Sequence, residues 1–169
     1  MLAEILVIAL LPMLLAVAGA WDLASFTIPN FLSLAMIALF GVFIFAAGLS
    51  ASSIGLHLLA GLLGLVIGFA LFALGWIGGG DAKLFAAVAL WLGFSDLLSY
   101  ALMASVCGGA LTLALLGLRH WALPAVLARQ PWALRLHDAR SGIPYGVALA
   151  VGAFILLPST EIFRLAVGA

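Results

Sequence analysis

Long apolar runs dominate the sequence, and short polar breaks separate them. A transmembrane barrel would instead show alternating segments of about ten residues. A spanning helix needs roughly 20 apolar residues, and five of the runs approach this length, whereas the run at 82–95 is shorter. The pattern therefore predicts an all-α, polytopic membrane protein with about six transmembrane helices, forming one membrane-embedded domain over residues 1–169. The expected spans are 2–20, 31–49, 54–76, 82–95, 97–118 and 143–163.

Composition supports the membrane assignment. Of the 169 residues 67% are hydrophobic and 7% are charged, and the mean hydropathy is +1.40, whereas a soluble domain carries about 25% charged residues. No Lys or Arg precedes the first run, which favours a span over a cleaved signal peptide, although Ala16, Val17 and Ala18 resemble a cleavage site. The zero net charge gives no case for nucleic acid as a partner, and the single cysteine, Cys107, excludes an internal disulfide and a four-cysteine zinc site. We expect membrane phospholipids as partners.

Basic residues predict the orientation of the chain. The connection of residues 119–142 carries four arginines, and Lys83 lies beside the connection between the third and fourth spans, whereas only Arg164 falls on the other side. The positive-inside rule places these connections, and the one after Asp22, in the cytoplasm. We therefore expect a multi-pass protein of the cytoplasmic membrane with both termini outside.

Two aspartates are the strongest candidates for chemistry. Asp22 and Asp81 both lie at predicted cytoplasmic ends of spans, and ionisable residues at membrane depth are costly. Two nearby carboxyl groups that share a proton can activate water and polarise a carbonyl group. Helix ends favour opposite charges, which predicts an ionised Asp81 at a helix start and a protonated Asp22 at a helix end. His57 is expected to be structural, and Asp96 to cap a helix.

Three consecutive glycines precede the second aspartate. Glycine loses more backbone entropy on folding than other residues, so it disfavours a helix. The three are Gly78, Gly79 and Gly80. They predict either an extended segment, along which a substrate could form hydrogen bonds, or a close approach by another backbone. A flexible connection between two spans is the alternative.

Glycines elsewhere predict helix packing. Small residues allow helices to approach closely in lipid, so two runs are expected to form packing seams without chemistry. They are Gly61, Gly64 and Gly68 in the third span and Ala104, Gly108 and Thr112 in the fifth.

Three blocks of the sequence together resemble the type IV prepilin leader peptidase family, the membrane aspartic proteases with a Gly-x-Gly-Asp motif. They are Asp22 followed by Ile28, Pro29 and Asn30; Gly78 to Asp81 followed by Lys83; and Ile143, Pro144, Tyr145 and Gly146. The short form of Flp/Tad pilus systems and of archaeal preflagellin peptidases is the most similar. Relatives often carry basic residues between Asp22 and Ile28, whereas this chain has none, so lipid contact is expected from Arg119 to Arg140.

The resemblance implies a function and a site. Asp22 and Asp81 match the catalytic aspartates, and the motif and substrate-binding residues would be Gly78, Gly79, Gly80, Lys83, Ile28, Pro29, Asn30 and Pro144. Such enzymes remove the short basic leader of prepilins at the cytoplasmic face, usually after a glycine, without a metal or other cofactor. The chain has no four-cysteine cytoplasmic domain, so N-methylation is not expected.

Two other functions fit the aspartates. Paired membrane carboxylates also form proton relays, so a small proton-coupled transporter is the main alternative. A non-catalytic membrane scaffold is the other alternative. If the protein is a scaffold, both aspartates should tolerate replacement by asparagine.

Overall fold

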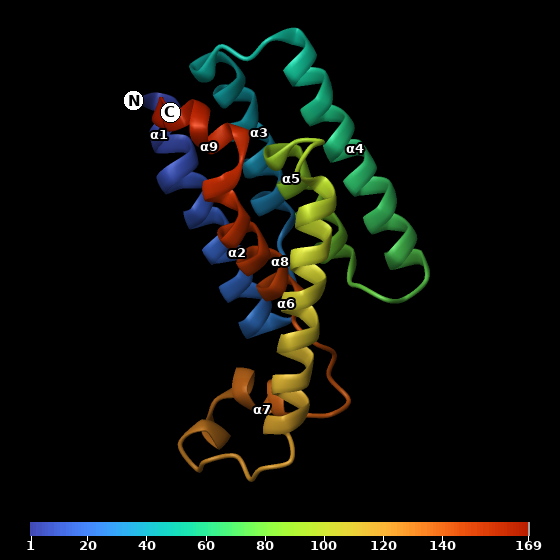
Figure 1. Ribbon diagram of the computed structural model, residues 1–169. Coiled ribbons are helices and arrows are strands. Elements are labelled where there is room, and N and C mark those ends of the chain that lie inside the picture. The colour runs from blue at the N-terminus through green and yellow to red at the C-terminus, as the bar shows by residue number, and fades with distance from the viewer. Residues whose placement is uncertain (169) are drawn as a thin grey trace.

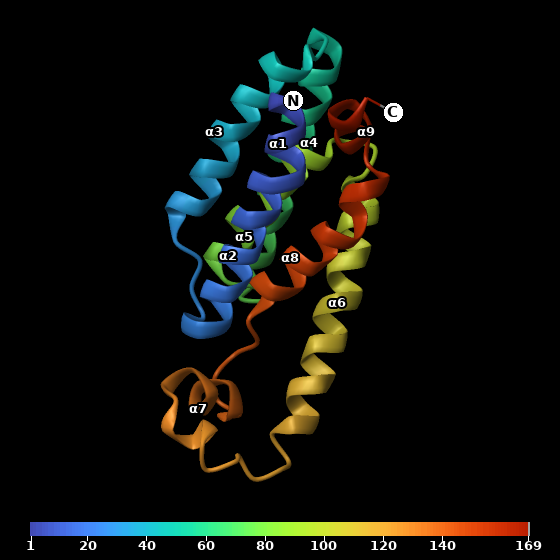
Figure 2. The same cartoon turned by 90° about the vertical axis from the view of Figure 1, so that its left-hand side faces the viewer.

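The computed structural model describes residues 1–168, which form helices and no strands. The long helices are α2 (Leu11–Ser25), α3 (Asn30–Ala47), α4 (Ala51–Ala73), α5 (Gly79–Leu92), α6 (Leu97–Leu118) and α8 (Tyr145–Leu156). The short elements are α1 (Leu2–Ile5), η1 (Leu6–Leu10), η2 (Leu127–Arg129), α7 (Pro131–His137), η3 (Leu157–Ser159) and α9 (Glu161–Val167). Both termini lie at one end of the bundle, and the connection that contains α7 lies at the other (Figures 1 and 2).

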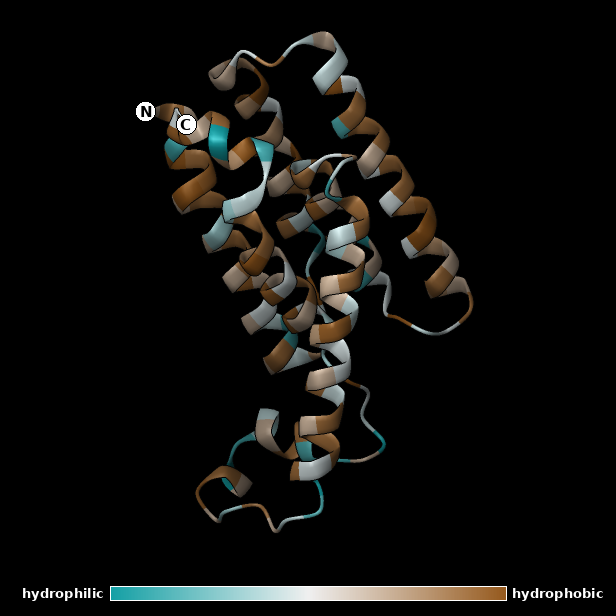
Figure 3. Ribbon diagram, viewed as in Figure 1, coloured by the Kyte–Doolittle hydropathy of each residue, from teal (hydrophilic) through white to brown (hydrophobic). Residues whose placement is uncertain are grey.

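The described helices confirm a multi-pass membrane protein. Four helical segments are each long and apolar enough to cross a membrane: Leu2–Ser25, α3, α4 and α6. Tyr145–Ser159 and α9 meet at a bend of 56°, and they give a fifth span if the pair counts as one. Apolar residues cover these helices, and polar ones collect in the connections (Figure 3). Helix α5 has 14 residues, or about 21 Å, against a hydrocarbon core of about 30 Å. The described residues thus give four or five candidate spans, and the sixth remains a prediction.

The short helix α5 forms the centre of the bundle. It contacts α3, α4, α6 and α8, and ten of its 14 residues are buried. Glycines bring α4 close to it, because a Cβ atom added at Gly64 would lie 2.9 Å from Ala89 Cβ, and one at Gly68 would lie 3.0 Å from the backbone of Ala82. The predicted seam along the third span is therefore confirmed.

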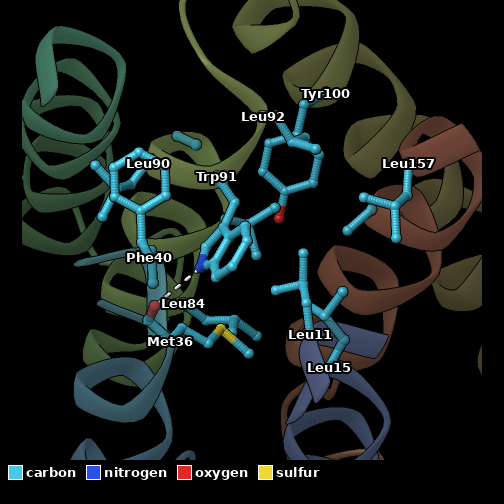
Figure 4. Packing of buried hydrophobic residues seen from close by; sticks show 14 of the residues in the cluster. Leu11, Leu15, Met36, Phe40, Leu84, Leu90, Trp91, Leu92, Tyr100 and Leu157 are labelled. Carbon is cyan, nitrogen blue, oxygen red and sulfur yellow. Dashed lines mark hydrogen bonds between the residues drawn. The ribbon is translucent and has the colours of Figure 1, made fainter. Parts of the chain in front are cut away.

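Aromatic side chains fill the core, and their polar atoms have partners. Trp91 Nε1 donates a hydrogen bond to the Met36 carbonyl oxygen at 2.9 Å (Figure 4). Tyr100 donates one to the Leu149 carbonyl oxygen at 3.3 Å. His57 is buried and places Nδ1 2.8 Å from the carbonyl oxygen of Leu90. The prediction that His57 is structural is confirmed.

One expected helix cap is wrong. Asp96 occupies the N-cap position of α6, but its side chain accepts no hydrogen bond from that helix. Its φ and ψ angles of −99° and −4° differ from the extended backbone that a capping aspartate normally adopts. Ser50 shows the expected geometry at the start of α4, where its hydroxyl accepts from the Ser53 N–H at 3.2 Å.

Candidate active site

Asp22 lies in the last turn of α2, with its side chain only 4% exposed. The helix ends at Phe26, which has a φ of +57°, an unusual conformation for a residue other than glycine. The Phe26 N–H donates to the Asp22 carbonyl oxygen at 2.7 Å. This turn reverses the chain and brings residues 26–28 beside the aspartate, where they line the same cavity.

Asp81 lies at the start of α5, with its side chain 8% exposed. Its Oδ2 atom accepts a hydrogen bond from the Gly78 N–H at 3.0 Å, which satisfies one free donor of the helix start. Gly78 is extended, but Gly79 and Gly80 belong to the helix. The prediction of an extended glycine segment is thus wrong for Gly79 and Gly80. The helix includes both residues although glycine has a low helix propensity.

The alternative interpretation of the glycines, a close approach by another backbone, is correct for Gly80. A Cβ atom there would lie 3.0 Å from Ile28 Cβ and 3.1 Å from the Ile28 nitrogen. The first turn of α5 therefore packs directly on the segment that follows α2. This contact explains why the two segments that carry the aspartates lie together.

Both aspartates line one cavity of about 300 Å³. Its other lining residues are Phe26, Thr27, Ile28, Gly78, Gly79 and Gly80. The two carboxyl groups are close enough for their charges to repel each other. Two buried carboxyl groups in this position favour a single shared proton, since both cannot easily be ionised together.

Gly146 is a third component of the site, to which the sequence assigned no role. Its backbone N–H, in the first turn of α8, donates to Asp22 Oδ2 at 2.7 Å, and Asp81 also lies within electrostatic reach of this amide. A Cβ atom at Gly146 would lie 2.8 Å from Asp22 Oδ2 and 2.7 Å from Ile28 Cδ1. Only glycine fits without a shift of its neighbours. The available signal was its place as the last residue of the block Ile143, Pro144, Tyr145 and Gly146.

This contact changes the electrostatic argument about the two aspartates. Asp22 ends α2 but also faces the start of α8, and Asp81 lies at the start of α5. Both carboxyl groups therefore face the positive end of a helix. Helix ends do not distinguish the two, so which aspartate is ionised remains a prediction.

The other residues expected at the site divide into two groups. Ile28 lines the cavity. Pro29 and Pro144 do not line it and stand at the N-cap positions of α3 and α8. Lys83 and Asn30 do not line it. They form a hydrogen bond of 2.8 Å with each other and line a separate cavity between α3, α4 and α5.

Comparison with known proteins gives one match. Residues 9–113 match the model of the type IV leader peptidase family, which is well over half of the chain and includes Asp22 and Asp81. No curated protein and no solved structure matches the chain. Among residues 1–168, no three His, Cys, Asp or Glu side chains form a group that could hold a metal ion.

Proposed function

Because the chain belongs to the type IV leader peptidase family, we propose that it is an intramembrane aspartic endopeptidase in which Asp22 and Asp81 are the catalytic pair. The observation that carries the proposal is the shared cavity. Two almost fully buried carboxyl groups line it together, and two backbone N–H groups hold them in place. The family membership supports peptide hydrolysis rather than proton-coupled transport.

The proposed reaction uses one proton shared by the pair. The ionised carboxylate accepts a proton from a water molecule as the water oxygen attacks the carbonyl carbon of the scissile peptide bond. The protonated carboxyl group donates a hydrogen bond to the carbonyl oxygen, where negative charge develops. Collapse of the tetrahedral intermediate breaks the C–N bond, and the leaving nitrogen takes up a proton from the pair. The Gly146 N–H orients Asp22 throughout.

The proposed substrates are prepilins or similar proteins with a short basic leader followed by an apolar helix. The lining residues of the cavity come from the end of α2 and the start of α5. These helix ends lie toward the same end of the bundle as the connection of residues 119–142, which carries four arginines (Figure 1). The positive-inside rule supports the cytoplasm as the location of this end and the outside as the location of both termini. Two termini on one side of the membrane fit the proposed six crossings. Leader removal would then occur at the cytoplasmic face, without methylation of the new terminus.

The test is cleavage of candidate prepilins by the purified protein in detergent, with leader loss followed by mass spectrometry. We expect the wild type to cut one bond, and Asp22→Asn and Asp81→Asn each to lower the rate by roughly 10²–10⁴-fold, as loss of a general acid or base does. Asp96→Asn is the matched control, because this carboxyl group does not line the cavity. A metal chelator should leave the rate unchanged.

Two results would contradict the proposal. Full activity in either cavity variant would show that the pair does not carry the chemistry. Absence of cleavage by the wild type, together with proton uptake in vesicles that depends on both aspartates, would instead support a transporter.

A further inference from the structure

A second cavity, of about 440 Å³, lies between α3, α4 and α5. It shares no lining residue with the cavity of the two aspartates. Three polar residues line it, Asn30, Ser33 and Lys83, and all three lie within the first five residues of α3 or α5. The remaining lining is apolar, and its larger side chains are Leu34, Ile37, Leu58, Leu62, Leu65 and Leu90. The cavity is thus polar at the end of the bundle that carries the aspartates and apolar beyond it.

The polar end carries a positive charge that no lining residue neutralises. Lys83 Nζ donates a hydrogen bond to Asn30 Oδ1 at 2.8 Å, and this amide is neutral. The cavity lining contains no carboxylate. Helix α3 also begins here, and no side chain caps its start, so its free N–H groups add to the positive potential. This end of the cavity favours an anion.

Ser33 supplies an independent sign of a ligand. Its side chain lines the cavity and is only 6% exposed, and its hydroxyl has no hydrogen-bond partner among residues 1–168. A buried polar group without a partner is costly. Ser33 lies one turn beyond Asn30 on α3, and its hydroxyl oxygen is buried. Rotation of this side chain toward the cavity would give the hydroxyl an acceptor held just below Lys83.

We propose that this cavity binds one anionic phospholipid. The phosphate contacts Lys83 Nζ, and one acyl chain lies along the apolar walls of α3, α4 and α5. The Ser33 side chain turns toward the cavity and donates a hydrogen bond to an ester oxygen. Basic pockets between transmembrane helices bind anionic headgroups in this manner. The gradient from cationic to apolar along the cavity matches an amphiphile. A segment with a basic leader fits less well, because Lys83 would repel it.

The test is native mass spectrometry of the detergent-purified protein mixed with phosphatidylglycerol or with phosphatidylcholine. We expect one phosphatidylglycerol to bind in preference to phosphatidylcholine, and Lys83→Gln to weaken its binding about fivefold, the effect of one basic residue near an anionic headgroup. Arg164→Gln is the matched control, because it removes one exposed positive charge that lies neither in the cavity nor in the arginine-rich connection of residues 119–142. It should leave binding unchanged.

A second pair of variants tests the apolar part. Leu34→Trp narrows the cavity and should weaken the binding of phosphatidylglycerol, while Leu102→Trp, an exposed position on α6 away from the cavity, should not. Equal binding by wild type and Lys83→Gln, or an equal loss of binding in Arg164→Gln, would overturn the proposal. It would also fail if neither lipid bound and Lys83→Gln and Leu34→Trp slowed only prepilin cleavage, since the cavity would then receive the substrate. Loss of lipid binding alone leaves the proposed peptidase activity intact, so the two proposals can fail separately.

Discussion

At the residue scale, Gly146 links the start of α8 to the catalytic pair. Its N–H donates a hydrogen bond to Asp22 Oδ2 at 2.7 Å, and the neighbouring atoms leave no room for a Cβ atom at this position. Gly146→Ala would push the added methyl group against Asp22 Oδ2 and Ile28 and displace the carboxyl group. A displacement of about 1 Å in an active site can cost roughly 100-fold in rate. We expect a loss of this size in the initial rate of prepilin cleavage, with the helical circular dichroism unchanged.

Gly109→Ala is the control for this variant. Gly109 lies within α6, and a Cβ atom there would meet nothing within 4 Å. The same chemical change should therefore leave cleavage close to the wild-type rate. If Gly146→Ala cleaves as fast as Gly109→Ala, the backbone of α8 does not position Asp22.

The sequence predicted the two aspartates but not their surroundings. Asp22 and Asp81 could be paired because few charges occur in an apolar chain and both fall at predicted span ends on one side. Gly146 could not be found in this way, because its role depends on contact with a residue 124 positions earlier in the chain. The same contact explains why helix ends do not distinguish the aspartates. The start of α8 lies beside Asp22 only in the folded molecule.

At the element scale, the apolar runs predicted the helices better than their boundaries. The run expected over 82–95 is α5, which begins at Gly79 and ends before Gly93, a glycine with a φ of +84°. The first span contains a π-helical turn, η1, directly before α2, where Pro12 lacks the N–H that an α-helix would use. Run length reveals neither feature, because both depend on local backbone hydrogen bonding.

The seam between α4 and α5 should be sensitive to added volume. Gly64→Val would place side-chain atoms against Ala89 and Ala86, and overpacking of this kind costs about 1–3 kcal/mol. We expect a lower midpoint of thermal unfolding in detergent. Cleavage should slow as well, because α5 carries Asp81.

Gly55→Val separates packing from helix propensity. Gly55 lies in the same helix, and a Cβ atom there would meet nothing within 4 Å. The intrinsic cost of valine in a helix is the same at positions 55 and 64. The unfolding midpoint of Gly55→Val should therefore stay near that of the wild type. Equal midpoints for the two variants would show that the close approach of α4 and α5 contributes little to stability.

At the scale of the whole molecule, the sequence predicted which segments share an end of the bundle. The order of the six expected spans assigns the basic connections, both aspartates and the glycine motif to one face. The count of Lys and Arg predicts that this face is the cytoplasmic one. The structure places α7 at one end and both termini at the other, in agreement with this division (Figures 1 and 2). Which end faces the cytoplasm depends on the membrane, so the fold alone does not determine it.

Cysteine labelling would determine this orientation. The chain has a single cysteine, Cys107, so Cys107→Ala provides a background in which Ser52→Cys and Ala128→Cys each add one exposed thiol at opposite ends of the bundle. We expect a membrane-impermeant maleimide to label Ser52→Cys in spheroplasts of an expression host and Ala128→Cys only after permeabilisation. The physical reason is the excess of arginines in residues 119–142, which are retained on the cytoplasmic side. The reverse labelling pattern would place the aspartates on the outer face, where they could not process a leader before its export.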